Sequence, residues 1–238
     1  MSDLHTIRAI AHVRSDFPTK FGIPRQSGLV DSLQATVVFT PEYRVAEAVR
    51  GLDGYSHIWL IWQFSEAVRD TWSPTVRPPR LGGNTRVGVF ATRSPYRPNS
   101  LGLSCVRLER VELHPELGPV LHIAGADLMD GTPVFDIKPY APYADCHPEA
   151  AGGFTEQTAW QPLQVDLPAE LAALVPADRR EALAGILAQD PRPAVQRRSA
   201  DRIYGLDFAG LNIRFTVTDG TAHVLSVKPL ASCAEPDI

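Results

Sequence analysis

The first 145 residues contain a series of short apolar runs that limits the folds open to the chain. Each run is rich in β-branched or aromatic residues and is bounded by glycine, proline or aspartate, which is typical of a β-strand. Few long helical periods separate the runs, and strands this frequent favour a barrel or a sandwich. The expected strands are residues 7–13, 35–39, 57–64, 86–91, 103–113 and 120–124. Residues 41–50 are expected to form a short helix that ends at Gly51.

A smaller unit is expected after residue 145, where the composition shifts toward alanine, glycine and polar residues. Residues 146–154 are interpreted as a linker or a long loop. Asp178 and Glu181 have the spacing of a capping box, which predicts a helix that ends at Asp190-Pro191. Three strands are expected after the helix, at residues 202–208, 211–217 and 222–227.

The turns between those three strands have a signature of their own. Ala209-Gly210 and Asp219-Gly220 suit two-residue hairpin turns. A helix and a three-stranded meander form a small unit, so we expect it to lean on the first domain. We therefore divide the chain into a β-rich domain, residues 1–145, and an α+β domain, residues 146–238.

Composition indicates a soluble protein without a structural metal. The chain is 44% hydrophobic and 21% charged, which are ordinary proportions for a globular protein. No apolar run approaches the roughly 20 residues of a membrane helix, and the N-terminus lacks the pattern of a signal peptide. We expect a cytoplasmic protein with no membrane contact. Cys105, Cys146 and Cys233 are widely spaced and form no Cys-x-x-Cys, so neither a disulfide framework nor a metal site is expected.

The charge of the chain is unevenly distributed. A net charge of −4 argues against a nucleic-acid partner, yet seven arginines and only one acid, Asp70, lie between residues 67 and 107. A second cluster contains Arg192, Arg197, Arg198 and Arg202. Guanidinium groups bind phosphate and stack on bases, so both clusters could meet RNA. The alternative is a solvated face whose arginines reflect codon usage, and charge alone does not decide between them.

Two polar segments, residues 77–102 and 127–140, interrupt the expected strands. Both combine glycine and proline with Arg, Asn, Asp and Tyr, as in rigid loops that present polar groups, although they could also be ordinary turns. The chain has no Gly-x-Gly-x-x-Gly, phosphate loop, Gly-x-Ser-x-Gly or His-Glu-x-x-His motif. The Asp/Asn-Pro-Pro-Tyr motif of common adenine-amino methyltransferases is also absent. These residues alone indicate a β-rich protein with two polar loop clusters.

The same segments resemble the TsaA-like family, also called YaeB or TrmO, of tRNA (adenine-37-N6)-methyltransferases. The resemblance rests on residues 21–28 (FGIPRQSG), 75–84 (TVRPPRLGGN), 88–102 and 127–140, with further likeness in residues 49–59 and 187–194. It spans almost the whole chain. Ser100, where the family usually has proline, is a departure.

The resemblance implies a mainly β fold, in which a small β-barrel binds S-adenosylmethionine without a Rossmann sheet and a smaller α+β domain follows. It implies a homodimer whose site lies near the subunit interface. The implied substrate is N6-threonylcarbamoyladenosine at position 37, next to the anticodon of tRNA-Thr. The residues implied to contact the cofactor are Pro24, Arg25, Gln26, Ser65, Glu66, Arg93, Leu103, Leu128, Met129, Asp130 and Gly131.

Methyl transfer from a sulfonium to a nitrogen needs the two groups to be held in line, with water excluded. We expect Asp130 or Glu66 to favour the sulfonium electrostatically, and Leu103, Leu128 and Met129 to form an apolar slot for its adenine. The basic cluster at residues 192–202 is expected to contact the tRNA backbone.

The threonylcarbamoyl group makes the acceptor nitrogen part of a urea with a more acidic proton. We expect Asp136, or else Asp130, to accept this proton with Tyr140 nearby. Arg97 with Asn99 would bind the threonine carboxylate. The alternatives are structural: Asp136 capping a turn, Tyr140 packing, and Arg97 bracing its own loop.

Three other functions remain open at this point. The chain could be a methyltransferase of the same fold that acts on another acceptor. It could also be a regulator that binds S-adenosylmethionine without turnover, or an RNA-binding barrel that ignores the cofactor.

Overall fold

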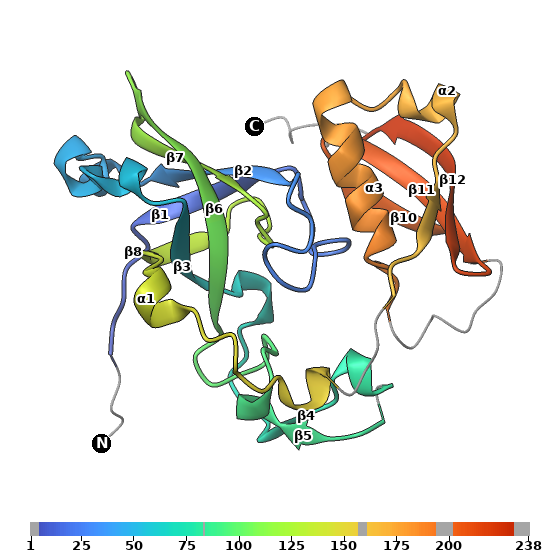
Figure 1. Cartoon of the computed structure of the whole chain (residues 1–238), viewed down its shortest axis with the longest axis horizontal. Coiled ribbons are helices and arrows are strands. Elements are labelled where there is room, and N and C mark those ends of the chain that lie inside the picture. The colour runs from blue at the N-terminus through green and yellow to red at the C-terminus, as the bar shows by residue number, and fades with distance from the viewer. Residues whose placement is uncertain (1–4, 83, 157–160, 194–201, 231–238) are drawn as a thin grey trace, which may run out of the picture.

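Six antiparallel strands close into a barrel in the computed structural model, which describes residues 5–82, 84–156, 161–193 and 202–230. In spatial order the strands are β1 (Ala11–Ser15), β2 (Gln34–Phe39), β7 (Gly118–Ala124), β6 (Leu101–His114), β3 (His57–Gln63) and β8 (Pro133–Pro139) (Figure 1). The mainly β fold with a barrel, expected from the sequence, is confirmed.

Alternating burial along each strand fills the barrel with side chains. In β3, Ile58, Leu60 and Trp62 point inward, while their neighbours are only partly buried. Trp62 fits because Gly102 faces it across the β3–β6 pair: a Cβ at Gly102 would lie 2.3 Å from the indole ring. The barrel interior is therefore a packed core, and ligands must bind at its ends or on its outer face.

Strand β8 lies within a segment whose residue pattern is typical of a polar loop. Residues 133–139 instead close the barrel by pairing with β1 and β3. Prolines at both ends of β8 and a bulge opposite Ile61 and Trp62 obscure the strand pattern, because proline is compatible with strand ends and not with strand centres.

Two other local predictions were wrong. Residues 41–50 form the 3-10 turns η1 (Pro41–Tyr43) and η2 (Ala46–Val49), and the extended backbone of Val45 separates them. Residues 86–91 contribute only the short strand β5 (Val87–Gly88), because a 3-10 turn follows it.

The chain between β3 and β6 leaves the barrel and forms a projecting lobe (Figure 1). Its described residues form the two-stranded sheet of β4 (Thr75–Val76) and β5, and three 3-10 turns. The turns are η4 (Ser65–Ala67), η5 (Pro79–Leu81) and η6 (Val89–Ala91). η3 (Leu52–Gly54) precedes β3, while α1 (Pro142–Asp145) and η7 (Gly153–Thr155) follow β8.

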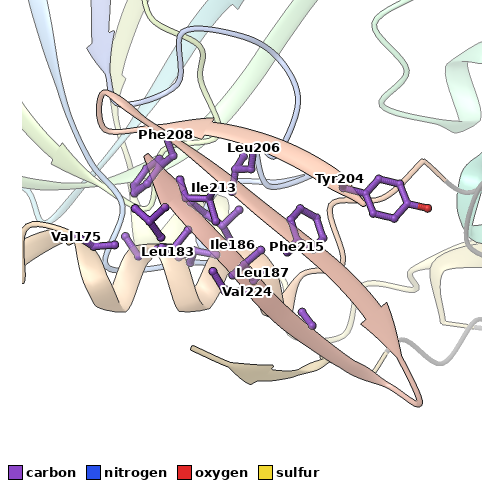
Figure 2. Packing of buried hydrophobic residues seen from close by; sticks show 14 of the residues in the cluster. Val175, Leu183, Ile186, Leu187, Tyr204, Leu206, Phe208, Ile213, Phe215 and Val224 are labelled. Carbon is purple, nitrogen blue, oxygen red and sulfur yellow. The ribbon is translucent and has the colours of Figure 1, made fainter. Parts of the chain in front are cut away.

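The C-terminal unit is a four-stranded sheet packed against a helix. The strands are β10 (Tyr204–Phe208), β11 (Leu211–Thr218), β12 (Thr221–Pro229) and β9 (Gln164–Asp166), which joins β12 in parallel. The helical elements are α2 (Ala169–Ala172), η8 (Ala177–Arg179) and α3 (Arg180–Ala188). Figure 2 shows Leu183, Ile186 and Leu187 of α3 against side chains of the sheet.

The predicted hairpins and helix of this unit are present, with one difference. Ala209, Gly210, Asp219 and Gly220 all have positive φ, as a two-residue hairpin turn with the strand twist requires. The capping box is not formed: Arg179 occupies the N-cap position without a side-chain cap, and Asp178 pairs with Arg179.

The C-terminal unit shares its core with the loop between β1 and β2. Phe17, Val30 and Leu33 from this loop are buried in the cluster that holds α3 and the sheet. A Cβ on Gly185 of α3 would lie 2.6 Å from Val30, so the loop and helix approach closely. The boundary at residue 145 stays a prediction, but this contact supplies the support that we expected the small unit to need.

Candidate functional site

Residues 24–28 and 127–131, which include the predicted cofactor residues 24–26 and 128–131, lie against each other at one end of the barrel. The Gly28 amide donates to the Gly125 carbonyl at 2.9 Å, and the Ser27 amide donates to the Asp127 carboxylate. The Arg93 guanidinium, which comes from the projecting lobe, donates to the Gln26 side-chain oxygen. The fold therefore brings together Gln26, Arg93 and the start of the 127–131 segment.

The carboxylate of Asp127 is the functional candidate that sequence reasoning missed. Ser104 donates its hydroxyl to Asp127 at 2.6 Å and accepts from the Trp62 indole nitrogen at 2.9 Å. Burial raises the pKa of Asp127, opposed by the Ser104 and Ser27 hydrogen bonds and the Arg93 charge. Its place at the head of the polar segment 127–140 was a signal, but its inward direction required the fold.

Asp130 and Gly131 form a turn fixed to the end of β1. The Asp130 carboxylate accepts from the Ser15 amide at 3.1 Å and lies 3.6 Å from the Arg14 guanidinium. Gly131 has φ of 77°, which favours glycine. The carboxylate remains 39% exposed, so it could still meet a positively charged ligand.

Leu128 and Met129 lie in the same turn but differ in accessibility. The Leu128 side chain is buried in the barrel core, and its carbonyl accepts from the Ser15 hydroxyl at 2.8 Å. Its side chain therefore cannot line an open adenine slot, so the predicted side-chain contact of Leu128 with adenine is wrong and only its backbone can contact the cofactor. Met129 is partly exposed, and its carbonyl accepts from Thr132.

Ser65 and Glu66 follow β3 and are exposed at the start of the lobe. Lys20 lies 3.7 Å from the Glu66 carboxylate. The preceding Phe64 amide donates to the Ser100 carbonyl, and Ser100 has φ of 43°. A proline ring fixes φ near −65°, so a protein with proline at this position must have a different local backbone.

Leu103 and Asp136 lie on the outer face of the barrel, on either side of Ile61. Both pair directly with Ile61, so the three side chains share one row. Leu103 is 53% exposed although it is apolar. The Asp136 carboxylate lies 2.9 Å from the Lys138 ammonium and accepts from the Ile137 amide at 2.9 Å. This row brings one predicted cofactor residue near one predicted catalytic residue.

Tyr140 follows β8 beyond this row. Its ring lies 5.9 Å from Trp59 and 6.1 Å from His57. Burial raises the pKa of Tyr140, and the nearby Cys146 thiol adds to that rise. The phenol therefore stays protonated at neutral pH and can donate a hydrogen bond.

Arg97 and Asn99 are on the lobe, between β5 and β6. Arg97 donates through Nη1 to the Thr92 carbonyl at 2.9 Å and to the Ser94 carbonyl at 3.4 Å, so it does brace its own loop. Asn99 is exposed. Within the described ranges, no hydrogen bond or ion pair joins Arg97 or Asn99 to Asp136 or Tyr140.

The C-terminal arginines are not a single exposed cluster. Arg192 is buried and forms an ion pair with Asp190 at 2.7 Å, so it is not available to phosphate. Arg202 is exposed and its guanidinium lies 5.7 Å from the Tyr204 ring centroid. Arg197 and Arg198 lie outside the described residues.

The chemistry of the site fits a nucleoside-containing cation. The exposed Asp130 carboxylate supplies negative charge, Gln26 and Arg93 supply donors, and Leu103 supplies apolar surface. Among the described residues, no group of three or more His, Cys, Asp or Glu could hold a metal ion. In the same part of the chain, no helix is long and apolar enough to cross a membrane.

Comparison with known proteins relates both parts of the chain to one family. Residues 12–146 match the tRNA-methyltransferase O N-terminal domain, and residues 160–230 match the TrmO C-terminal domain. The tRNA (adenine(37)-N6)-methyltransferase of Escherichia coli K12 is 40% identical over 92% of this chain and 96% of its own length. A Pseudomonas aeruginosa protein with the provisional name S-adenosylmethionine-dependent methyltransferase RcsF is 40% identical, over 89% of this chain and 92% of its own. The crystal structure of TrmO from Pseudomonas aeruginosa superposes with a TM-score of 0.76 at 34% identity, covering 96% of this chain and 99% of that one.

Proposed function

The chain belongs to the tRNA-methyltransferase O family of S-adenosylmethionine-dependent tRNA (adenine-37-N6)-methyltransferases, and we propose that it methylates N6-threonylcarbamoyladenosine in tRNA-Thr. The observation that carries the proposal is the joining of Gln26, Arg93 and the 127–131 turn at the barrel end, since the sequence resemblance assigns residues from each of these separate segments to cofactor binding. The methyl-transfer chemistry itself follows from family membership, and the acceptor is the part that we infer.

The cofactor residues are proposed to act through charge and shape. When bound, S-adenosylmethionine supplies an electrophilic methyl group on a positive sulfonium. Asp130 would provide negative charge near this centre, with Asp127 holding the neighbouring segment in place. Gln26 and Arg93 would contact polar groups of the cofactor, and Leu103 would cover part of its adenine. The backbone at Pro24, Arg25, Ser65, Glu66, Leu128, Met129 and Gly131 completes the proposed contacts.

The acceptor is proposed to lie over the outer row of the barrel. Asp136 would accept the N6 proton, which the urea of the threonylcarbamoyl group makes more acidic than in plain adenosine. Tyr140, protonated at neutral pH, would donate a hydrogen bond to the urea carbonyl. Lys138, 2.9 Å from the Asp136 carboxylate, would hold that carboxylate in position.

Arg97 and Asn99 are proposed to recognise the threonine carboxylate. Both carbonyls bound by Arg97 accept from Nη1, and among the described residues no hydrogen bond is made by Nε or Nη2, which would bind the ligand. The guanidinium is oriented by these two carbonyls before substrate binds. Arg97 can therefore brace its own loop and also bind the threonine carboxylate. Unmodified adenosine would offer no carboxylate, and its absence would leave the guanidinium unpaired.

The test is methyl transfer from labelled S-adenosylmethionine to tRNA from cells that contain or lack the threonylcarbamoyl modification. We expect label only in the modified pool. Equal labelling of both pools would refute the proposed acceptor while leaving the enzyme class intact. Cofactor binding with no label in either pool would favour another acceptor or a regulator without turnover.

The subunit arrangement and location are further parts of the proposal. We propose a homodimer with its site near the interface, and a cytoplasmic protein, because both accompany this family. Sedimentation equilibrium of the purified protein should give twice the 26.0 kDa chain mass. A monomer with full activity would refute the proposed homodimer.

A further inference from the structure

The projecting lobe between β3 and β6 carries an exposed aromatic surface that the assigned site residues do not explain. Trp72, Phe90 and Tyr96 are 52%, 72% and 41% exposed. The rings of Trp72 and Phe90 lie 6.1 Å apart, and the Arg69 guanidinium lies 3.9 Å from the Tyr96 centroid. Large aromatic side chains that remain exposed together usually mark a binding surface.

A small cavity lies beside Trp72, Tyr96 and Arg69. It has a volume of about 140 Å³, and its lining includes Trp72, Tyr96, Arg69 and Arg97. Arg97 also braces the adjoining loop through the Thr92 and Ser94 carbonyls, so one wall of the cavity is fixed. The cavity therefore adjoins the residue that we propose to bind the threonine carboxylate.

The charge of the lobe identifies the class of partner. Residues 67–97 contain six arginines and one aspartate, a net charge of +5 in a chain whose total is −4. Arg69, Arg77, Arg86 and Arg93 are exposed. A positive surface attracts a polyanion, and flat aromatic faces among the arginines fit unpaired bases rather than a duplex, whose bases are already stacked.

We propose that Trp72 and Tyr96 form a stacking platform for unpaired nucleotides of the anticodon loop next to the methylated adenosine. This inference rests on the proposed function, since it assumes an RNA loop as substrate. Arg69 holds the Tyr96 ring from one side, and the cavity between Trp72 and Tyr96 receives a base. Phe90 extends the platform along the loop. The lobe thereby selects for a single-stranded loop, while the barrel carries the proposed cofactor and acceptor sites.

The test uses Trp72→Ala and Tyr96→Ala with an anticodon stem-loop of tRNA-Thr, measured by fluorescence anisotropy. Because removal of one base-stacking ring costs about 1–3 kcal/mol, we expect each variant to bind the loop about 5- to 150-fold more weakly. Trp72→Phe should restore most of the affinity. KM for tRNA should rise more than kcat falls, and S-adenosylmethionine binding by calorimetry should be unchanged.

Two controls isolate the stacking. Tyr143, 94% exposed on α1, is an aromatic residue outside the lobe, and Tyr143→Ala should bind the loop like the unsubstituted protein. A fully paired duplex with the same charge should bind the unsubstituted protein and Trp72→Ala equally. The platform is overturned if Trp72→Ala and Tyr96→Ala keep loop affinity within about twofold while the unsubstituted protein methylates tRNA.

A second measurement applies if an alanine variant also loses cofactor binding through misfolding. A stem-loop with 2-aminopurine beside position 37 should lose fluorescence on binding the unsubstituted protein, as stacking quenches this base. Binding without any such quenching would overturn the platform. Failure of the unsubstituted protein to methylate any tRNA would instead refute the proposed function, so the two failures are distinguishable.

Discussion

Replacing Asp127 should separate the two segments that form the barrel end. The Asp127 carboxylate accepts from the Ser104 hydroxyl at 2.6 Å and from the Ser27 amide, so it connects β6 to the 24–28 segment. Asp127→Ala leaves both donors without an acceptor, and Ser104 also loses the constraint that orients it toward Trp62. The change therefore affects folding stability and cofactor binding together.

The size of the effect follows from these contacts. Each buried donor left unsatisfied costs about 1–3 kcal/mol, and because Ser104 is buried and Ser27 only partly buried, the two together cost at most about 2–6 kcal/mol. Removal of a desolvated carboxylate recovers part of this, and we expect a net loss near 2–4 kcal/mol, a large share of a typical total of about 5–15 kcal/mol. Asp127→Asn keeps one acceptor oxygen and should lose about half as much.

The pH dependence provides a second readout. The raised pKa of Asp127, caused mainly by burial, means that the folded state holds this proton more tightly than the unfolded chain. The group therefore contributes stability below its unfolded pKa, about 3.9, and this contribution is lost as pH rises through the folded pKa. The stability of the unsubstituted protein relative to Asp127→Asn should accordingly increase as pH falls through the acid range.

Urea unfolding at several pH values and calorimetric titration with S-adenosylmethionine measure both effects. We expect the Asp127→Ala protein to unfold at lower urea and to bind cofactor more weakly than Asp127→Asn. Stability within about 0.5 kcal/mol of the unsubstituted protein, together with unchanged cofactor affinity, would refute the reasoning.

Two further substitutions test the packing and the outer face of the barrel. Gly102→Ala would bring a Cβ to within 2.3 Å of the Trp62 ring, so we expect the free energy of unfolding to fall by about 1–3 kcal/mol. An unchanged midpoint in thermal or urea unfolding would contradict this close approach. Asp145 accepts from the Ala141 amide at 2.8 Å and from the Trp59 indole at 3.0 Å, and these bonds lower its pKa. The stabilising contribution of Asp145 is therefore present above about pH 4 and lost as pH falls below it. Asp145→Asn should show a weaker dependence of unfolding on acid pH, measured by tryptophan fluorescence. An acid profile identical to that of the unsubstituted protein would count against the hydrogen bond between Asp145 and Trp59.

The barrel could be predicted from the sequence where strands show their own alternation. Residues 35–39 and 57–64 nearly match β2 and β3, since each exposes one face to the core and one outward. β8 was missed because prolines and polar residues dominate residues 133–139, and only pairing with β3 identifies it as a strand. The helix expected at residues 41–50 failed because its apolar residues have little core to cover, with only Val49 buried.

The sequence predicted which segments contribute to the candidate site, but not how these segments are arranged in space. The polar segments contained Arg93 and Asp130, and the resemblance assigned them to cofactor binding. Sequence could not show that Arg93 reaches Gln26, that Asp127 points inward, or that the Leu128 side chain is buried, because each depends on contacts between distant residues. Ion pairs cannot be predicted from sequence either. Arg192 was expected to contact RNA, but it is buried and forms an ion pair with Asp190.

The most direct test of the account is to locate the methyl group after reaction with tRNA-Thr. Digestion to nucleosides and fragment mass spectrometry should find one added methyl, on N6 of the nucleoside at position 37, and a tRNA with guanosine at that position should remain unlabelled. Methyl groups at another position or atom, or undiminished labelling of the guanosine-37 tRNA, would contradict the assignment of this chain as an adenine-37 N6-methyltransferase.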